Sequence, residues 1–258
     1  MDEERSRAPD EGSPETSVRD TYDRIADHFA STRKYPWPEV IAFLGGKPTG
    51  DLDSAAEAAL GGGAGLGSSG QRDAAGDTAN RLGLDLGCGN GRHGESLAGV
   101  VERVVGVDVS RGLLETARER SRARDYDDAL GLVQADAAAL PIRADVVDVA
   151  VYVATLHHLR SRAARVASLS ELARVLAPGG RALVSAWSTA HDRFEESQGF
   201  DTTVPWTLPG GEQVERFYHI YDPAEFESDL AASDLDVVSS VVSSGNCYAV
   251  VEAGELSY

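Results

Sequence analysis

Apolar positions recur along the chain with two alternating periods. Short apolar runs, typical of buried strands, occupy residues 82–86, 104–109, 130–133, 146–153 and 181–187. After Ser110 and Ser161, apolar residues recur every three or four positions, which predicts a helix after each serine. This alternation predicts an α/β fold, a mostly parallel sheet with helices on both faces, with ligands bound at the carboxyl ends of its strands.

The two ends of the chain have patterns of their own. Apolar residues at helical spacing from Val18 to Phe29 predict a helix that begins near Ser17. A short helix over 222–232 is followed by two apolar segments around Ser244-Gly245-Asn246, which predicts a closing antiparallel hairpin. Residues 188–221 are expected to form a long loop. Pro178-Gly179-Gly180 is expected to end the helix before the fifth strand.

Composition divides the chain into four segments. Residues 1–16 form an acidic segment that we expect to be a disordered tail, and residues 17–44 hold the first helix and a loop. Residues 45–80 hold ten Gly and eight Ala, so we expect an insertion or linker there. Residues 81–258 carry the alternating pattern and form the α/β domain.

Charge and cysteine content narrow the setting. The chain has 24 basic and 42 acidic residues, a net charge of -18 and only two lysines, a composition that resembles proteins hydrated in concentrated salt. An ordinary acidic protein is the alternative. Two cysteines form neither a disulfide framework nor a zinc site, so we expect no metal. Because the chain shows neither a signal peptide nor a membrane span, we expect a cytoplasmic protein without a membrane partner.

The loop after the first strand carries the cofactor signal. It reads Asp85-Leu86-Gly87-Cys88-Gly89-Asn90-Gly91, and Arg92 stands where a dinucleotide fingerprint needs its third glycine. Asp85 would repel a pyrophosphate but attract the ammonium and sulfonium groups of S-adenosylmethionine. Charge therefore favours the methyl donor over NAD.

Acidic residues follow the next two strands. Asp108 at the end of the second strand is placed to accept hydrogen bonds from ribose hydroxyls. Asp136 and Ala137 follow the third strand, where adenine is expected. A helix cap at Asp136 and a solvated strand end at Asp85 are the structural alternatives. Together with Gly87, Gly89, Asn90 and Gly91, these residues predict the cofactor site.

From residue 82 to about 252 the chain resembles the class I S-adenosylmethionine-dependent methyltransferases. This resemblance implies a Rossmann-like seven-stranded sheet that ends in the antiparallel hairpin. Further strings resemble the tRNA wobble-uridine carboxymethyl methyltransferases, which esterify 5-carboxymethyluridine. The matching strings are residues 22–29, 32–38, 85–91, His157-His158, 204–206 and 216–221. No Asn-Pro-Pro-Tyr-like turn follows the fourth strand, so exocyclic-amine methylation is not expected.

The resemblance implies roles for residues outside the cofactor loop. Arg33, His158 and His219 are the catalytic candidates. Trp37, Trp206, Arg216, Tyr218 and Asn246 are the substrate-binding candidates. The resemblance also implies a tRNA substrate and a small zinc-binding activator protein, expected as a heterodimer partner at the third-strand edge of the sheet, where exposed apolar residues would need cover.

Other functions remain open at this point. A class I methyltransferase of a small metabolite would need no explanation for its acidic surface. A cofactor-binding regulatory subunit without activity would keep the same fold. An NAD-dependent oxidoreductase agrees least with the glycine loop.

Overall fold

A computed structural model describes residues 17–48, 52–64 and 80–254. Its main strands are β1 (Leu82–Leu86), β2 (Arg103–Asp108), β3 (Leu130–Gln134), β4 (Val147–Val153), β5 (Leu176–Trp187), β8 (Leu235–Ser243) and β9 (Asn246–Ala253). They form one seven-stranded sheet in the order β3-β2-β1-β4-β5-β9-β8. Strands β1 to β5 pair in parallel, while β9 is antiparallel to both β5 and β8. The predicted fold class is confirmed, including the closing hairpin.

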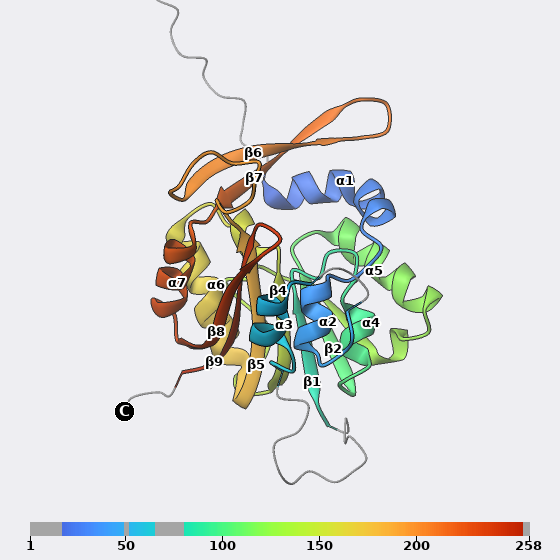
Figure 1. The fold of residues 1–258 in the computed structure, drawn as a ribbon. Helices are drawn as coiled ribbons and strands as arrows, with labels where there is room; N and C mark the ends of the chain where they lie inside the picture. Colours follow the sequence, from blue (N-terminus) through green and yellow to red (C-terminus); the bar gives the residue numbers. More distant parts are fainter. Residues whose placement is uncertain (1–16, 49–51, 65–79, 255–258) are drawn as a thin grey trace, which may run out of the picture.

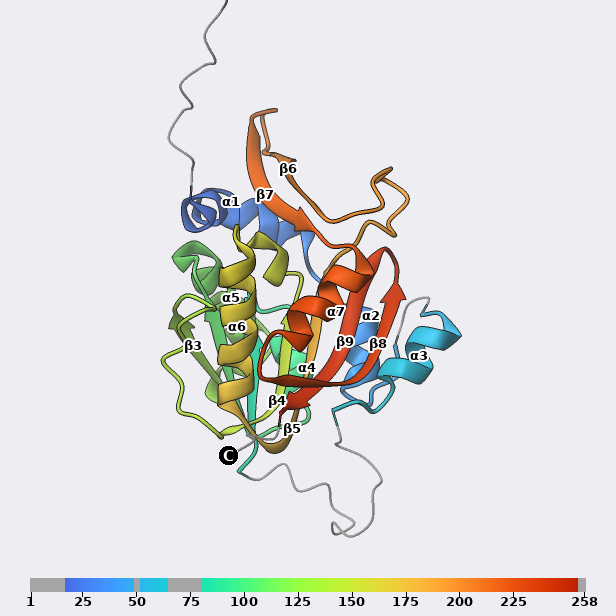
Figure 2. The same ribbon diagram turned by 90° about the vertical axis from the view of Figure 1, so that its left-hand side faces the viewer.

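Helices cover both faces of this sheet (Figures 1 and 2). On one face lie α2 (Pro38–Phe43), α3 (Ser54–Leu60) and α4 (Gly94–Ala98); on the other lie α6 (Arg162–Val175) and α7 (Pro223–Ala231). Successive strand residues point to opposite faces, so Ala150 packs toward α6 and Val151 toward α2. The core therefore consists of two apolar layers, one on each face of the sheet, and these layers hold the strands and their carboxyl ends in place.

The first helix, α1 (Val18–Thr32), forms where its apolar stripe predicts, and the Ser17 side chain accepts a hydrogen bond from the backbone N–H of Asp20. Its end is linked to the sheet, because the side-chain amide of Asn90 donates to the Arg33 carbonyl over 2.8 Å. The next long helix, α5 (Arg111–Ala123), is capped by Ser110 and packs against α1 and β3. Figure 1 shows α1 lying across the carboxyl ends of the strands.

The long loop expected over 188–221 is a wrong prediction for most of its length. Strands β6 (Phe200–Thr207) and β7 (Gln213–Ile220) form a separate antiparallel hairpin. Trp206 and Val214 pack on Tyr22 and Ile25, so α1 provides the apolar surface that this hairpin needs. The hairpin lies over α1, on the side away from the sheet (Figure 1).

Two further expectations change. The 45–80 segment holds α3, capped by Asp53, and its Ala56 and Leu60 are fully buried, so part of this segment does build the core. Strand β5 begins at Leu176, so Pro178-Gly179-Gly180 lies inside an irregular strand and not in a turn before it. The predicted tail, 1–16, lies outside the described residues. None of the helices in the described segments has the length and apolarity to cross a bilayer.

Candidate active site

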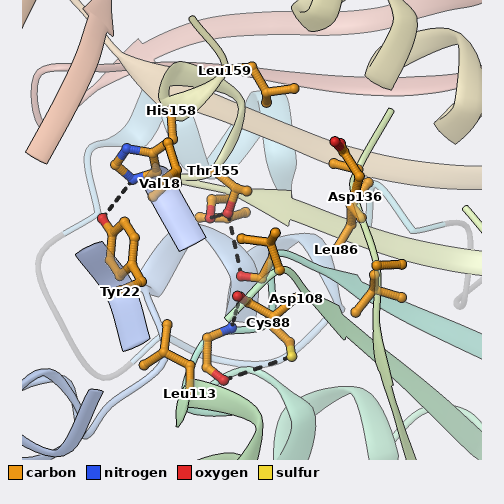
Figure 3. Close-up of a pocket in the computed structure, with 18 of the residues that line it drawn as sticks. Val18, Tyr22, Leu86, Cys88, Asp108, Leu113, Asp136, Thr155, His158 and Leu159 are labelled. Atoms are coloured by element: carbon orange, nitrogen blue, oxygen red, sulfur yellow. Dashed lines mark hydrogen bonds between the residues drawn. The ribbon is translucent and has the colours of Figure 1, made fainter. Parts of the chain in front are cut away.

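A cavity of about 390 Å³ opens at the carboxyl ends of β1, β2 and β4. Its walls come from α1, the glycine loop after β1, the segments that follow β2 and β3, and the turn after β4 (Figure 3). This is the edge of the sheet where the alternating pattern places a ligand. A volume of this size suits a small organic cofactor.

The glycine loop is shaped by close packing. Gly87 has a φ of +70°, and a Cβ at this position would lie 2.1 Å from the Thr155 hydroxyl oxygen. Gly87, Gly89 and Asn90 line the cavity, as predicted from the sequence. Gly91 is not a lining residue and lies against Ala117 of α5. At Gly87 and Gly89 the loop therefore brings backbone to the cavity wall.

Asp108 is held by the same loop. One carboxylate oxygen accepts from the Gly89 N–H over 2.8 Å (Figure 3). The other accepts from the Ser110 N–H, also over 2.8 Å. Burial raises the pKa of Asp108 to about 6, although these backbone donors lower it. Each oxygen keeps a lone pair for a ligand hydroxyl. Asp136 and Ala137 line the same wall, and Asp136 also accepts from the Ala138 N–H over 2.9 Å.

Asp85 does not lie where the sequence interpretation put it. It is 2% exposed and is not among the residues that line the cavity. Its Oδ2 atom has no hydrogen-bond partner among the described residues. Burial raises the pKa of Asp85 to about 7; nearby Arg92 lowers it, and Asp108 raises it further. Asp85 therefore lies behind the cavity wall, where its charge interacts with those of Arg92 and Asp108, which line the cavity.

These residues fit S-adenosylmethionine. The cavity has the required size, a glycine loop allows backbone approach, and acids stand at the ends of β2 and β3 in the order that a ribose and an adenine require. Asp108 would hold the ribose, and Asp136 with Ala137 would border the adenine. The group supplies an electrophilic methyl on a sulfonium.

A second cavity of about 190 Å³ adjoins the first. Both are lined by Val18, Tyr22, His158 and Arg160, and the second is also lined by Thr21, Thr203, Glu215, Arg216 and Phe217. It thus lies between α1 and the β6–β7 hairpin, and Tyr22 and His158 stand at the boundary that it shares with the donor cavity. A substrate in this cavity would approach the donor beside these two side chains.

His158 is held as a neutral imidazole. Its Nδ1 lies 2.9 Å from the Phe217 carbonyl, which only accepts, so Nδ1 carries the hydrogen. Its Nε2 then accepts from the Tyr22 hydroxyl over 2.8 Å (Figure 3). Burial lowers the pKa of His158 to about 4. His157 stacks on Tyr218 and lines neither cavity, so His158 is the member of the pair that faces the site.

Arg216 is a buried cation without an acid. It is 7% exposed, and one guanidinium nitrogen donates to the Tyr218 hydroxyl over 2.7 Å. Its Nε has no partner, and no acidic side chain in the described segments lies within 4.0 Å of its guanidinium nitrogens. Its charge lowers the pKa values of His157 and His158. Among the described residues, Arg216 therefore places a guanidinium without an ion pair in the wall of the second cavity, and the exposed Glu215 lines the same cavity.

The remaining predicted residues surround this centre without lining it. Arg33 is exposed, with its guanidinium carbon 5.2 Å from the centre of the Trp206 ring. Trp206 donates from Nε1 to His28 over 3.0 Å and packs on α1. Trp37 packs edge-on against Tyr248 of β9, with ring centroids 6.3 Å apart. Asn246 is buried at the start of β9, where its amide donates to the Ser244 carbonyl.

His219 lies between two acidic side chains. Its ring nitrogens lie 2.7 Å from Asp201 and 2.9 Å from Glu225, and it lines neither cavity. His219 points away from the site because side chains alternate along β7, so neighbouring Tyr218 takes the inner position. The structure places its ring in contacts that support the hairpin, and its catalytic role stays a prediction.

Sequence reasoning missed Tyr22, Thr155 and Arg92 as lining residues. Tyr22 looked like one member of an apolar stripe, and only the fold shows that its hydroxyl reaches His158. Arg92 was noticed only because it breaks the dinucleotide fingerprint. Its place directly after the glycine loop was the signal available.

Comparison with known proteins agrees with this site. Residues 84–184 match the family described as a methyltransferase domain. The chain is 32% identical over 189 residues to the tRNA (carboxymethyluridine(34)-5-O)-methyltransferase of Macaca fascicularis, covering 72% of this chain and 21% of that protein. It is 30% identical over 198 residues to the enzyme of the same name from Saccharomyces cerevisiae, covering 74% of this chain and 57% of that protein. Thus the chain spans less than two thirds of either relative.

Two more comparisons address the domain and its fold. A protein of Encephalitozoon cuniculi named as a methyltransferase is 30% identical over 175 residues, covering 66% of this chain and 77% of that protein. The structure of the CcbJ methyltransferase from Streptomyces caelestis superposes with a TM-score of 0.63 at 20% identity, covering 94% of this chain and all of that one. The second similarity concerns the fold alone.

Proposed function

This chain belongs to the S-adenosylmethionine-dependent methyltransferase family, and we propose that it esterifies the carboxylate of 5-carboxymethyluridine at the wobble position of tRNA. The observation that carries the proposal is Arg216 in the wall of the second cavity, a buried guanidinium that makes no ion pair with an acid among the described residues. A desolvated cation is costly unless an anion neutralises it. A substrate carboxylate supplies that anion, and the planar guanidinium suits it.

The chain's own groups suit an acceptor that is already ionised. A carboxylate oxygen can take a methyl group without losing a proton, so no general base is required. His158 stays neutral at neutral pH, since burial lowers its pKa to about 4, and its two ring nitrogens are engaged by Phe217 and Tyr22. The Tyr22–His158 pair therefore shapes the boundary between the cavities, while Arg216 holds the acceptor in place.

Methyl transfer to two matched tRNAs tests the proposal. One carries carboxymethyluridine, and the other carries the corresponding amide at the same position. With methyl-labelled donor in high-potassium buffer, we expect label only in the carboxylate form, and mild alkali should release it as methanol because it is an ester. Alkali-stable label, or equal labelling of the amide form, would refute this acceptor and favour a different methylation.

We also propose that a small zinc-binding activator protein binds along β3. This strand is the outer edge of the sheet, and its Leu130, Leu132 and Val133 are only half-buried, which supports an interaction there. Leu132→Lys should abolish a heterodimer measured by size-exclusion chromatography while donor affinity stays unchanged. A heterodimer that survives this change would exclude β3 as the interface.

A further inference from the structure

Arg92 is a second cation at the site that makes no ion pair within the part of the chain that the structure describes. It follows Gly91, lines the donor cavity and is half-buried. Its guanidinium carbon lies 5.0 Å from the centre of the Trp37 ring, a cation–π contact that restricts where the side chain can point. Trp37 itself packs edge-on against Tyr248 of β9, so the sheet holds the ring on which Arg92 lies.

The charge of Arg92 has no ion-pair partner among the described residues. No acidic side chain in the described ranges comes within 4.0 Å of its guanidinium nitrogens. Burial lowers the pKa of Arg92 to about 10, Asp85 behind the wall raises it, and Arg33 lowers it again. Arg92 is therefore still a cation at neutral pH, facing a cavity.

The two sides of the donor cavity differ in charge. Asp108 and Asp136 stand after β2 and β3, whereas Arg92 lies beyond β1 at the end of the glycine loop. A ligand that presents hydroxyl and amine groups to the acids would present its other end to Arg92. The donor carries a carboxylate at that other end, on its amino-acid portion.

We propose that Arg92 binds the carboxylate of the donor's amino-acid portion and that Trp37 is the positioning residue that holds Arg92 in place. The inference rests on the donor that the family uses and not on the tRNA acceptor. It assigns Trp37, expected from the sequence to bind substrate, to the donor side. It also gives a role to the position at which the dinucleotide fingerprint fails.

Calorimetry with two ligands tests this assignment in the full chain. The ligands are S-adenosylhomocysteine and its decarboxylated analogue, which differ only in the carboxylate. The wild type should bind the first about 10- to 100-fold more tightly, as expected for a charge-assisted pair. Arg92→Met should weaken S-adenosylhomocysteine by the same factor and leave the affinity for the analogue unchanged, so the preference disappears.

Unchanged binding of the analogue also shows that Arg92→Met is folded. Arg92→Lys keeps the charge and should keep part of the preference, while Trp37→Leu should reduce it. Arg111→Met is the matched control, because Arg111 is an exposed arginine on α5 paired with Glu115 and lines neither cavity. Equal weakening of both ligands by Arg92→Met, or an intact preference, would overturn the proposal. No tRNA is present, so failure of the acceptor proposal leaves this result interpretable.

Discussion

Two regions of this molecule bury charged side chains, and they treat them in opposite ways. Between α6 and α7, Arg165 is 4% exposed and lies within 3.6 Å of Asp229 and 3.5 Å of Glu225. At the cavities, Arg216, Arg92 and Asp85 are at least partly buried without an ion pair in the described part of the chain. The charges between α6 and α7 neutralise one another, whereas the charges at the cavities make no ion pair within the described residues.

The paired cluster is extensive. Asp229 is fully buried, accepts from Arg162 over 2.6 Å and from the Tyr221 hydroxyl over 3.0 Å, and also faces Arg165. Glu225 joins this cluster to His219 at the base of the β6–β7 hairpin. The contacts of this cluster thus connect α6 and α7, on one face of the sheet, to the β6–β7 hairpin.

Breaking the paired cluster should have the largest effect on stability. Asp229→Ala leaves Arg165 buried with only Glu225 opposite it, which should lower the free energy of unfolding by about 3–5 kcal/mol. Urea denaturation measures this, with Asp229→Asn as the shape-matched control that isolates the charge. The affinity of the remaining folded protein for donor should not change. A loss below about 1 kcal/mol would show that this cluster is not structural.

Removing an unpaired buried charge should raise the free energy of unfolding, whereas breaking the paired cluster lowers it. Asp85 has a pKa near 7 in the fold against an ordinary value of 3.8, because burial disfavours its ionised form. A raised carboxyl pKa means that its stabilising contribution is present below about pH 4 and is lost as the pH rises to about 7. Asp85→Asn escapes this loss, so it should stabilise the unliganded protein above about pH 7, by up to about 4 kcal/mol.

Thermal unfolding of wild type and Asp85→Asn across this pH range checks the prediction. The difference between the two proteins should grow from about pH 4 to about pH 7 and then level off. Asp222→Asn, at the exposed cap of α7, controls for a general effect of removing one negative charge. A difference that is independent of pH would mean that Asp85 does not titrate in this range.

Arg216→Met should separate function from stability. Because this buried charge has no ion pair in the described part of the chain, its loss should leave the free energy of unfolding unchanged or raise it. Loss of the acceptor contact should lower kcat/KM for the carboxylate substrate roughly 30- to 100-fold, with donor affinity unchanged. Labelled methyl transfer and calorimetry measure the two, and Arg216→Lys should recover part of the activity. Full activity in the Met variant would remove Arg216 from the acceptor site.

The contrast between these regions also explains what the sequence could predict. The alternation of strands and helices, the Gly87–Gly89 loop and the position of Asp108 at a strand end followed from local patterns, because each depends on residues close in the chain. The β6–β7 hairpin did not, because its apolar side chains pack on α1, almost two hundred positions away. Whether a charge is paired is equally non-local: Arg165 and Arg216 look alike in sequence, and only the fold shows which one meets an acid.

His219 gives the smallest expected effect and the most direct test of this contrast, since the sequence suggested a catalytic role and the structure places it with the paired charges. Its ring bridges Asp201 and Glu225 below the hairpin. Gln cannot reproduce both contacts, so His219→Gln should cost about 1 kcal/mol of stability. Turnover per folded molecule should stay within about twofold, because the ring touches neither cavity. A turnover loss as large as that of Arg216→Met, with stability intact, would support a catalytic role for His219. It would also show that a side chain with acidic partners in this fold can still take part in catalysis.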